Sequence, residues 1–374
     1  LREGRPPFFE PGLPELLSAQ VSSGRLSFST DTAEAAGARV HFIAVGTPQR
    51  SDGNGADLRF VDAAIVAGKS TVPVGTAARL AERVLARGAF LAWNPEFLRE
   101  GFAIKDTLHP DRLVYGVREE RDTVVATLDA VYASTIAEGT TRFVTDFATA
   151  ELVKTAANAF LATKISFINA MAEIAEVTGA DVAELADAIG FDARIGRRFL
   201  NAGVGFGGGC LPKDIRAFQA RAEELGVGSS VRFLEEVDKI NLRRRSRVIE
   251  VASNLLGGSL EGKRVGVLGL AFKPDSDDVR DSPALDIATR LHQAGAHVVA
   301  TDPEAIANSR LRFPTMTFGT IDEAVDGADI LILLTEWTQY RELDPAALRD
   351  RVASPLIVDG RNVLDAAAWT AAGW

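Results

Sequence analysis

Residues 201–214 read NAGVGFGGGCLPKD and contain the only cysteine of the chain, Cys210. Five glycines precede this cysteine, and Pro212 and Lys213 follow it. Proline is favoured in the first turn of a helix, and the amphipathic run at 215–225 has helical spacing. Cys210 is therefore predicted just before a helix N-terminus, where the partial positive charge of the helix end and a nearby lysine stabilise a thiolate.

Two other interpretations of this stretch were weighed. A lone cysteine is most often a small buried residue, but a buried strand or helix does not carry this much glycine, and glycines let a substrate approach the backbone. Gly203, Gly205 and Gly208 match the dinucleotide pattern G-x-G-x-x-G. That pattern requires a preceding strand, whereas residues 194–202 are basic and helix-like, so the dinucleotide interpretation is rejected.

The run from Gly205 to Asp214 resembles the active-site signature of the UDP-glucose/GDP-mannose dehydrogenase family, and further motifs from Phe8 to Asp365 agree with it. The resemblance implies an α/β fold with two Rossmann-like, doubly wound domains, joined by a central helical segment with a long spine helix. We expect an NAD-binding domain at 1–146, a central helical domain with the catalytic loop and a dimerisation role at 147–256, and a UDP-sugar-binding domain at 257–374.

Composition limits the remaining possibilities. The chain has 374 residues, 47% of them hydrophobic, and a net charge of −10, which argues against a nucleic-acid partner. A single cysteine excludes an intrachain disulfide framework and fits a reducing compartment. No apolar run approaches the roughly 18 residues of a membrane span, and no signal peptide is visible. We expect a cytoplasmic protein with no membrane partner and no metal site.

Two features suggest that residues are absent from the sequence. The chain starts at Leu1, and the helical pattern at 57–65 runs into the strand pattern at 66–70 without a connecting turn. In the resembled family, the segment beginning at Phe8 follows a first βαβ unit that carries the dinucleotide phosphate loop. We therefore expect that unit to be missing here.

Strands are predicted at 40–45, 66–70, 90–93 and 112–116, the last of these closing the first domain. The resemblance makes Thr47 and Thr71 cofactor contacts, with Thr71 also positioning a water. From the residues alone, Thr47 lies in an ordinary turn, and Thr71 is more commonly a helix cap.

Glu96 and Glu100 are four residues apart and share a face if the segment is helical, where such pairs are usually solvated. The resemblance instead makes Glu96 a candidate for water activation, Glu100 a cofactor-positioning residue, and Phe97 and Leu98 substrate contacts. The polar residues between 106 and 112 show no metal-ligand spacing, so a loop-packing role is expected for them.

A helix of about 30 residues is predicted at 148–177, because this run lacks proline and glycine. Lys154 and Asn158 lie on one of its faces, which is ordinarily a polar stripe. The resemblance places both beside the catalytic cysteine. It also makes Arg194 reach the substrate of a neighbouring subunit. A later helix at 231–255 contains three arginines, at 243–245, for which we expect a solvated or subunit-contact face.

The run from 263 to 358 alternates strands and helices as a second doubly wound domain does. The resemblance assigns Lys273 to the substrate, Arg280 to the cofactor and Arg361 to the nucleotide sugar. Phe206, Gly207 and Gly208 are substrate contacts on the same grounds. Lys273 and Arg361 are also reasonable phosphate-binding residues from their positions at strand ends.

The resemblance implies NAD-dependent, four-electron oxidation of UDP-glucose to UDP-glucuronate, in the service of polysaccharide biosynthesis, by a homodimer. A thiohemiacetal and then a thioester on Cys210 would keep the aldehyde bound. Lys154 and Asn158 would stabilise oxyanions, and Asp214 would act as general base. GDP-mannose or another nucleotide sugar is the alternative substrate. A non-catalytic nucleotide-sugar-binding protein is the alternative class, and a thiol acyl transferase is disfavoured because no histidine partner is evident.

Overall fold

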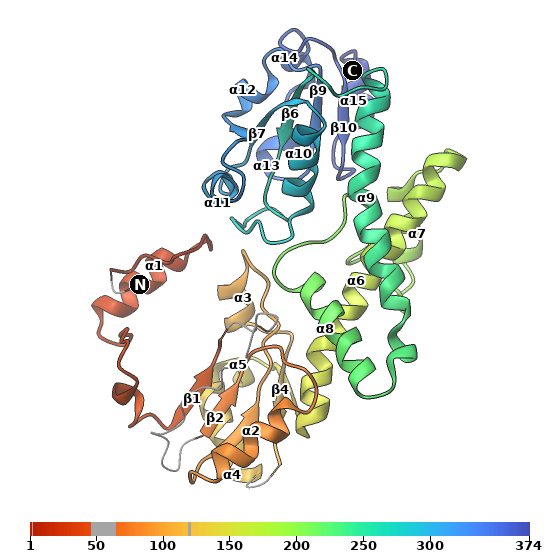
Figure 1. The fold of residues 1–374 in the computed structure, drawn as a ribbon. Helices are drawn as coiled ribbons and strands as arrows, with labels where there is room; N and C mark the ends of the chain where they lie inside the picture. Colours follow the sequence, from red (N-terminus) through yellow and green to blue (C-terminus); the bar gives the residue numbers. More distant parts are fainter. Residues whose placement is uncertain (2, 46–64, 119–120) are drawn as a thin grey trace. The chain divides into compact units, whose positions relative to one another are not determined.

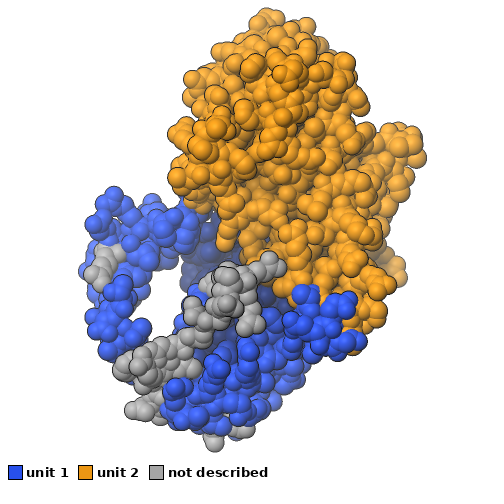
Figure 2. Space-filling view, viewed as in Figure 1, with its two compact units in different colours: residues 1–158, 220–226 blue, residues 159–219, 227–374 orange. Residues whose placement is uncertain are grey.

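The computed structural model describes residues 1, 3–45, 65–118 and 121–374, which divide into two compact units (Figure 2). Unit 1 comprises Leu1–Asn158 with Ala220–Gly226, and unit 2 comprises Ala159–Gln219 with Val227–Trp374. The three-domain division expected from the sequence stays a prediction.

The described part of unit 1 holds a five-stranded sheet whose strands lie side by side in chain order. The strands are β1 (Val40–Ile43), β2 (Ile65–Gly68), β3 (Phe90–Trp93), β4 (Arg112–Gly116) and β5 (Thr141–Thr145). β1, β2 and β3 are parallel, β3 and β4 are antiparallel, and β4 and β5 are parallel again. The prediction that residues 112–116 form the last strand is wrong, because β5 pairs beyond them.

Helices cover both faces of this sheet, so β2 is buried on both sides. Val66 packs into a cluster with α2 (Thr76–Leu85) and the start of α6 (Phe147–Thr178). Ile65 and Ala67 instead pack into a cluster with α4 (Arg121–Val131). Alternating side chains on a strand point to opposite faces, which explains this division. The remaining helical segments are short: α1 (Leu13–Ser22), η1 (Thr32–Ala35), α3 (Ala103–Leu108) and α5 (Ala133–Ala137).

The expected join near Ile65 and Val66 borders residues outside the described ranges, and Thr47 itself lies outside them. Within the described part, β2 begins directly at Ile65. It ends at Gly68, where a side chain would collide with the indole of Trp93 on β3.

The predicted long helix is confirmed as α6 (Phe147–Thr178), which spans 32 residues. The division between the two units falls within it, after Asn158. The helix predicted at 231–255 is present as α9 (Phe233–Leu255), and a shorter helix, α7 (Val182–Gly190), is capped by Asp181.

Unit 2 contains a fully parallel sheet in the order β10-β9-β6-β7-β8 (Figure 1). Its strands are β6 (Arg264–Leu268), β7 (His297–Thr301), β8 (Thr317–Phe318), β9 (Ile330–Leu333) and β10 (Ile357–Asp359). The chain proceeds outward from β6 through β7 and β8, and then returns to the other side through β9 and β10. This doubly wound order confirms the predicted fold class and puts the topological switch point between β6 and β9.

The helices of this sheet are α10 (Pro283–Gln293), α11 (Ile306–Arg312), α12 (Ile321–Val325), α13 (Thr338–Arg341), α14 (Pro345–Arg349) and α15 (Ala366–Ala371). β9 is buried on both faces, since Ile330 and Ile332 join one apolar cluster and Leu331 another. The first cluster also contains Val248 and Ala252 of α9, so α9 packs directly on this α/β domain.

The remaining helices of unit 2 pack on the second half of α6. One cluster joins α6 to α8 (Leu211–Glu224), η2 (Gly228–Val231) and α9, and another joins it to α7. The expectation of a solvated or subunit-contact arginine face on α9 is wrong for two of its three residues. Arg244 and Arg245 are buried within unit 2, and only Arg243 is exposed.

Candidate functional site

Cys210 immediately precedes α8, as the sequence predicts, and it is exposed. Its carbonyl oxygen accepts the amide of Asp214 at 2.9 Å, which is the first hydrogen bond of the helix. Cys210 therefore occupies the N-cap position. The unpaired amides and the dipole of a helix N-terminus favour a negative charge at this point, so they favour the thiolate.

Asp214, the predicted general base, lies in the first turn of α8 with a side chain only 2% exposed. Its Oδ1 atom is 2.9 Å from Nζ of Lys213. Lys213 and the first turn of α8 therefore place positive charge beside this buried carboxylate. The structure thus brings Cys210, Lys213 and Asp214 together at one helix end.

The glycines before Cys210 meet a requirement that the sequence did not reveal, because they pack against the loop between β6 and α10. A side chain at Gly207 would collide with the carbonyl oxygen of Asp281. Gly208 has a φ of 81°, and a Cβ there would lie 2.9 Å from the ring of Phe272. A Cβ at Gly209 would meet only the guanidinium of Arg280, at 2.5 Å.

Buried amide side chains hold the start of the same loop. Asn241 on α9 accepts the Phe206 amide at 2.7 Å and donates to the Phe206 carbonyl at 3.0 Å. Asn169 on α6 accepts the amide of Gly203 at 2.8 Å. The ring of Phe206, a predicted substrate contact, belongs to the apolar cluster with α6 and α8. The hydrogen bonds with Asn241 and the apolar packing of the ring therefore fix the position of Phe206.

Arg361, the predicted nucleotide-sugar residue, lies at the switch point. Its Nε donates to the carbonyl of Leu334 after β9 at 2.6 Å, and its Nη2 donates to the carbonyl of Phe272 after β6 at 3.2 Å. The Arg361 guanidinium therefore contacts the loops that follow β9 and β6, which is where open α/β sheets bind ligands. Asp302, directly after β7, holds the segment that follows β6, because its Oδ2 atom accepts the amides of Leu270 and Ala271.

The two other predicted residues of this edge lie in the loop after β6. The ammonium of Lys273 is 5.5 Å from the centre of the Phe272 ring. Arg280 is exposed, and the carboxylate of Asp278 binds its Nε and Nη2 atoms at 2.8–3.0 Å.

Unit 1 gathers a second group of predicted residues around Lys154. The side chain of Lys154 is only 7% exposed, and its ammonium nitrogen lies 3.4 Å from Oε1 of Glu96. It is also 5.5 Å from the centre of the Phe97 ring. The Oε2 atom of Glu96 accepts the amide of Leu98 at 2.6 Å. The segment is not helical, so Glu96 and Glu100 do not form the helical pair considered from their spacing.

Lys69, directly after β2, belongs to the same group. The sequence places it inside the strand predicted at 66–70 and therefore does not predict it as a site residue. Its ammonium donates to Oδ1 of Asn94 and to the hydroxyl of Tyr132, both at 3.2 Å. The pKa of Lys69 is lowered to about 8, mainly by burial. The nearby Glu96 opposes this shift, and Lys154 contributes to it. The sequence shows only a lysine at a strand end, whereas its burial and lowered pKa, which mark candidate site residues, appear in the structure.

Glu151, one turn before Lys154, has a structural role. Its carboxylate accepts the amides of Gly75 at 2.7 Å and Ala77 at 2.6 Å at the start of α2. Burial raises the pKa of Glu151, and these hydrogen bonds oppose the shift. The alternative of Thr71 as a cap is not observed, since the N-cap residue of α2 is Gly75.

The remaining predicted residues are placed as follows. Asn158 is buried on α6, and Glu100 and Thr71 are partly buried in unit 1. Arg194 is exposed in unit 2, where Asp192 binds its guanidinium at 2.6 Å. Thr47 is outside the described residues.

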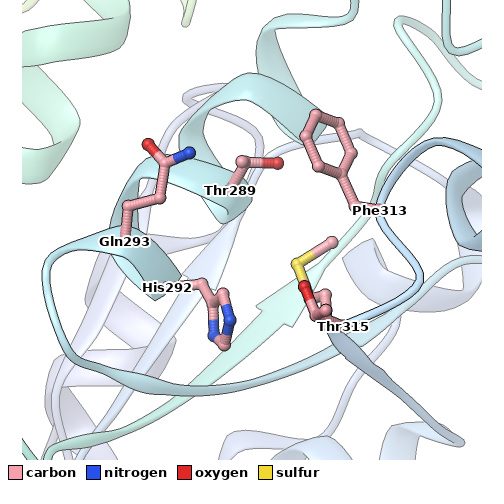
Figure 3. Close-up of a pocket in the computed structure, with 6 residues that line it drawn as sticks. Thr289, His292, Gln293, Phe313 and Thr315 are labelled. Atoms are coloured by element: carbon pink, nitrogen blue, oxygen red, sulfur yellow. The ribbon is translucent and has the colours of Figure 1, made fainter.

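A cavity of about 300 Å³ lies elsewhere in unit 2 (Figure 3). It opens between the second half of α10 and the segment before β8, at the amino-terminal edge of the sheet, opposite the Arg361 edge. It contains none of the predicted site residues, its lining being Thr289, His292, Gln293, Phe313, Thr315 and Met316.

Two kinds of feature are absent from residues 1, 3–45, 65–118 and 121–374. No helix there has both the length and the apolar character that a membrane crossing requires. No cluster of three or more histidine, cysteine or acidic side chains suited to a metal ion occurs in that part of the chain either.

Comparison with known proteins matches this chain to the three domains of one family, described as the UDP-glucose/GDP-mannose dehydrogenase family. Its NAD binding domain matches residues 1–136, its central domain 148–243 and its UDP binding domain 266–366.

Individual relatives agree with this match. UDP-glucose 6-dehydrogenase YwqF of Bacillus subtilis is 41% identical over 384 residues, which cover 97% of this chain and 85% of the relative. UDP-glucose 6-dehydrogenase of Rhizobium meliloti is 41% identical over 382 residues, covering 97% and 87%. A solved UDP-glucose dehydrogenase from the archaeon Pyrobaculum islandicum has a TM-score of 0.87 at 38% identity, and the match covers 98% of this chain and 87% of that one. The resemblance inferred from the motifs is confirmed.

Proposed function

The chain belongs to the UDP-glucose/GDP-mannose dehydrogenase family, and from this premise we propose that it oxidises UDP-glucose to UDP-glucuronate with NAD. Relatives with this activity in their names are about 40% identical over nearly the whole chain. The observation that carries the proposal is the exposed Cys210 at the N-terminus of α8, after a glycine loop with no room for side chains at Gly207 and Gly208.

NAD fits the carboxyl edge of the parallel strands in unit 1. Ser70 and Thr71 follow β2 there, and Asn94 and Glu96 follow β3, so polar groups collect where such sheets bind ligands. When bound, the nicotinamide accepts a hydride at each of two oxidation steps. Thr71 and Glu100 are the described unit 1 residues that we propose to contact it, and Arg280 of unit 2 is the third.

The thiolate of Cys210 is the nucleophile of the proposed reaction. Loss of a hydride and a proton converts the C6 alcohol to an aldehyde. The sulfur then adds to the aldehyde carbon, giving a thiohemiacetal whose oxygen takes up one proton. Loss of a second hydride and that proton leaves a thioester. Water adds to the thioester and the C–S bond breaks, giving the carboxylate, one proton and the Cys210 thiol.

The other residues are assigned supporting roles. Asp214 is next to the nucleophile in the same helix turn and, with a water, is the proposed general base. On the family resemblance, Lys154 and Asn158 stabilise the oxyanions, Glu96 and Thr71 position the hydrolytic water, and Phe97 and Leu98 contact the sugar. Arg361 and Lys273 supply positive charge for the diphosphate at the second sheet, with backbone groups of Phe206, Gly207 and Gly208 nearer the sugar.

The proposed function is tested by incubating the protein with NAD and UDP-glucose and recording absorbance of the reduced nicotinamide. NADH formation requires both substrates if the proposal holds. NADH from GDP-mannose only would keep the chemistry and change the sugar. Binding of UDP-glucose without NADH would show a nucleotide-sugar-binding protein instead of a dehydrogenase.

The proposal extends to a homodimer. The second half of α6 exposes apolar side chains seven residues apart: Phe160 at 66%, Phe167 at 48% and Ile174 at 55% exposure, with Val177 at 88%. Residues at this spacing lie along one face of a helix and suit a second copy of the same helix. Sedimentation equilibrium would show a mass of two chains, and Phe167→Glu would reduce it to one. A wild-type mass of one chain would contradict the dimer.

The remaining assignments rest on the reaction. Catalysis by a thiolate needs a reducing compartment, which supports the cytoplasm as the site of action. Glucuronate units then serve polysaccharide biosynthesis, as the family resemblance implies. Three domains with boundaries near 146 and 256 remain the proposed division. The exposed guanidinium of Arg194 is available to a partner subunit's substrate in such a dimer.

A further inference from the structure

Arg245 lies on the buried face of α9, four residues after Asn241, and its side chain is 5% exposed. Its Nη2 atom donates to Oδ1 of Asp281 at 2.9 Å and reaches the carbonyl oxygen of the same residue at 3.4 Å. A buried guanidinium must be paired to be tolerated, and here one Nη2 group donates to two acceptors of the same residue. Arg245 therefore fixes both the side chain and the backbone of Asp281.

Asp281 has an unusual backbone conformation and contacts two helices. Its φ is 45°, in the left-handed region that residues with a side chain seldom adopt. Its Oδ2 atom lies 3.5 Å from Nη1 of Arg216 on α8, while Oδ1 is bound by Arg245 on α9. The carboxylate thus links both helices to the loop between β6 and α10.

The glycine loop packs directly on this part of the backbone. A Cβ at Gly207 would collide with the carbonyl oxygen of Asp281 and would lie 2.6 Å from Cδ of Pro283. The amide of Gly208 donates to the carbonyl of Arg280 at 2.9 Å. The path of the chain three residues before Cys210 is consequently set by the position of Asp281.

We propose that Arg245 is a positioning residue for Cys210: by holding Asp281, it fixes the surface on which the glycine loop packs and so sets the thiol at the N-terminus of α8. All of these contacts lie within unit 2. The turnover readout of this proposal rests on the proposed function. The reactivity of the thiol does not.

The test is the alkylation of Cys210 by iodoacetamide across the pH range, which is specific because the chain has one cysteine. The thiolate displaces iodide, forming an S–C bond as the C–I bond breaks. Arg245→Met is expected to slow alkylation at pH 7 about 3- to 10-fold and to move the profile to higher pH, since a displaced thiol loses the stabilising helix end. Arg245→Lys should recover part of the rate.

The control is Arg243→Met, on the same helix but exposed and paired with Glu173. We expect this variant to alkylate within twofold of the wild type. Asp281→Gly removes the carboxylate while keeping the left-handed conformation accessible, and it also removes the ion pair with Arg216, so it should slow alkylation at least as much as Arg245→Met. This variant also carries the test if Arg245→Met does not fold.

The double variant Arg245→Met/Asp281→Gly should be no slower than the slower single variant, because both act on one contact. Multiplying effects would overturn the proposal, and so would unchanged alkylation profiles in the folded single variants. Turnover is expected to fall in parallel with alkylation. Absence of any turnover in the wild type would refute the proposed function and leave the alkylation result standing.

Discussion

The two groups of site residues are built differently. In unit 1, charged side chains form the group, with Lys154 and Lys69 both largely buried near Glu96. In unit 2, the conformation of the backbone forms the group. Gly207 and Gly208 have no room for a side chain, and Asn241 holds the backbone of Phe206 by hydrogen bonds. Substitutions in unit 1 should therefore act through charge and depend on pH, whereas substitutions in the unit 2 loop should act through packing.

The largest effect is expected from removing the proposed nucleophile. Cys210→Ala should reduce NADH formation at least about 10³-fold, because both the thiohemiacetal and the thioester need the sulfur. UDP binding, measured by calorimetry, should persist, since Arg361 and Lys273 are untouched. A variant that keeps a tenth of the wild-type turnover would contradict the covalent scheme.

The next largest effect distinguishes charge from packing in unit 1. Lys154→Met keeps much of the volume and removes the charge, and kcat should fall by about 10²- to 10³-fold through loss of oxyanion stabilisation. Lys105→Met, at an exposed lysine of the same unit, is the matched control and should leave kcat unchanged. Equal kcat values for the two variants would remove Lys154 from the mechanism.

Lys69 sharpens the comparison through pH. Its pKa in the folded protein is about 8, below its usual value of 10.5, so its charge destabilises the fold at pH values below 8, by about 3 kcal/mol. This penalty shrinks between pH 8 and 10.5 and is gone above that range. Lys69→Met should therefore raise the free energy of unfolding at pH 7 by about 1–2 kcal/mol, after allowing for the hydrogen bonds lost to Asn94 and Tyr132.

Urea denaturation at pH 7 and pH 10 measures this difference. We expect the advantage of Lys69→Met over the wild type to shrink as the pH rises. An advantage that grows with pH would show that the lysine is stabilised by its neighbours instead of destabilised by burial.

The last prediction compares two adjacent glycines of the unit 2 loop. Gly208→Ala forces a side chain into a φ of 81° beside the Phe272 ring and should destabilise the protein by about 1–3 kcal/mol. Gly209→Ala meets only the movable end of Arg280 and should stay within about 0.5 kcal/mol. Thermal unfolding compares them, and equal melting temperatures would show that the loop is not shaped by its packing.

Much of the architecture could be predicted from local patterns. The uninterrupted apolar periodicity of α6 and the proline after Cys210 gave correct positions for the spine helix and for the start of α8. β5 was missed because three of its residues, Thr141, Arg142 and Phe143, are exposed, so the strand lacks an apolar signal. Its pairing with β4 is a long-range contact that no local pattern encodes.

The site was predicted less completely, because burial depends on tertiary packing. The arginines at 243–245 look like a solvated run, yet helical spacing puts Asn241, Arg244 and Arg245 on one buried face against the glycine loop. Lys69 carries no motif of its own and is recognisable only once Asn94 and Tyr132 are seen around it.

The central claim is a four-electron oxidation through Cys210, and the most direct test is the stoichiometry of NADH. The protein is incubated with a limiting amount of UDP-glucose and excess NAD, and the absorbance of NADH is followed to completion. The account predicts two NADH for each sugar consumed, with UDP-glucuronate as product. One NADH per sugar with release of the aldehyde, or no NADH at all, would contradict it.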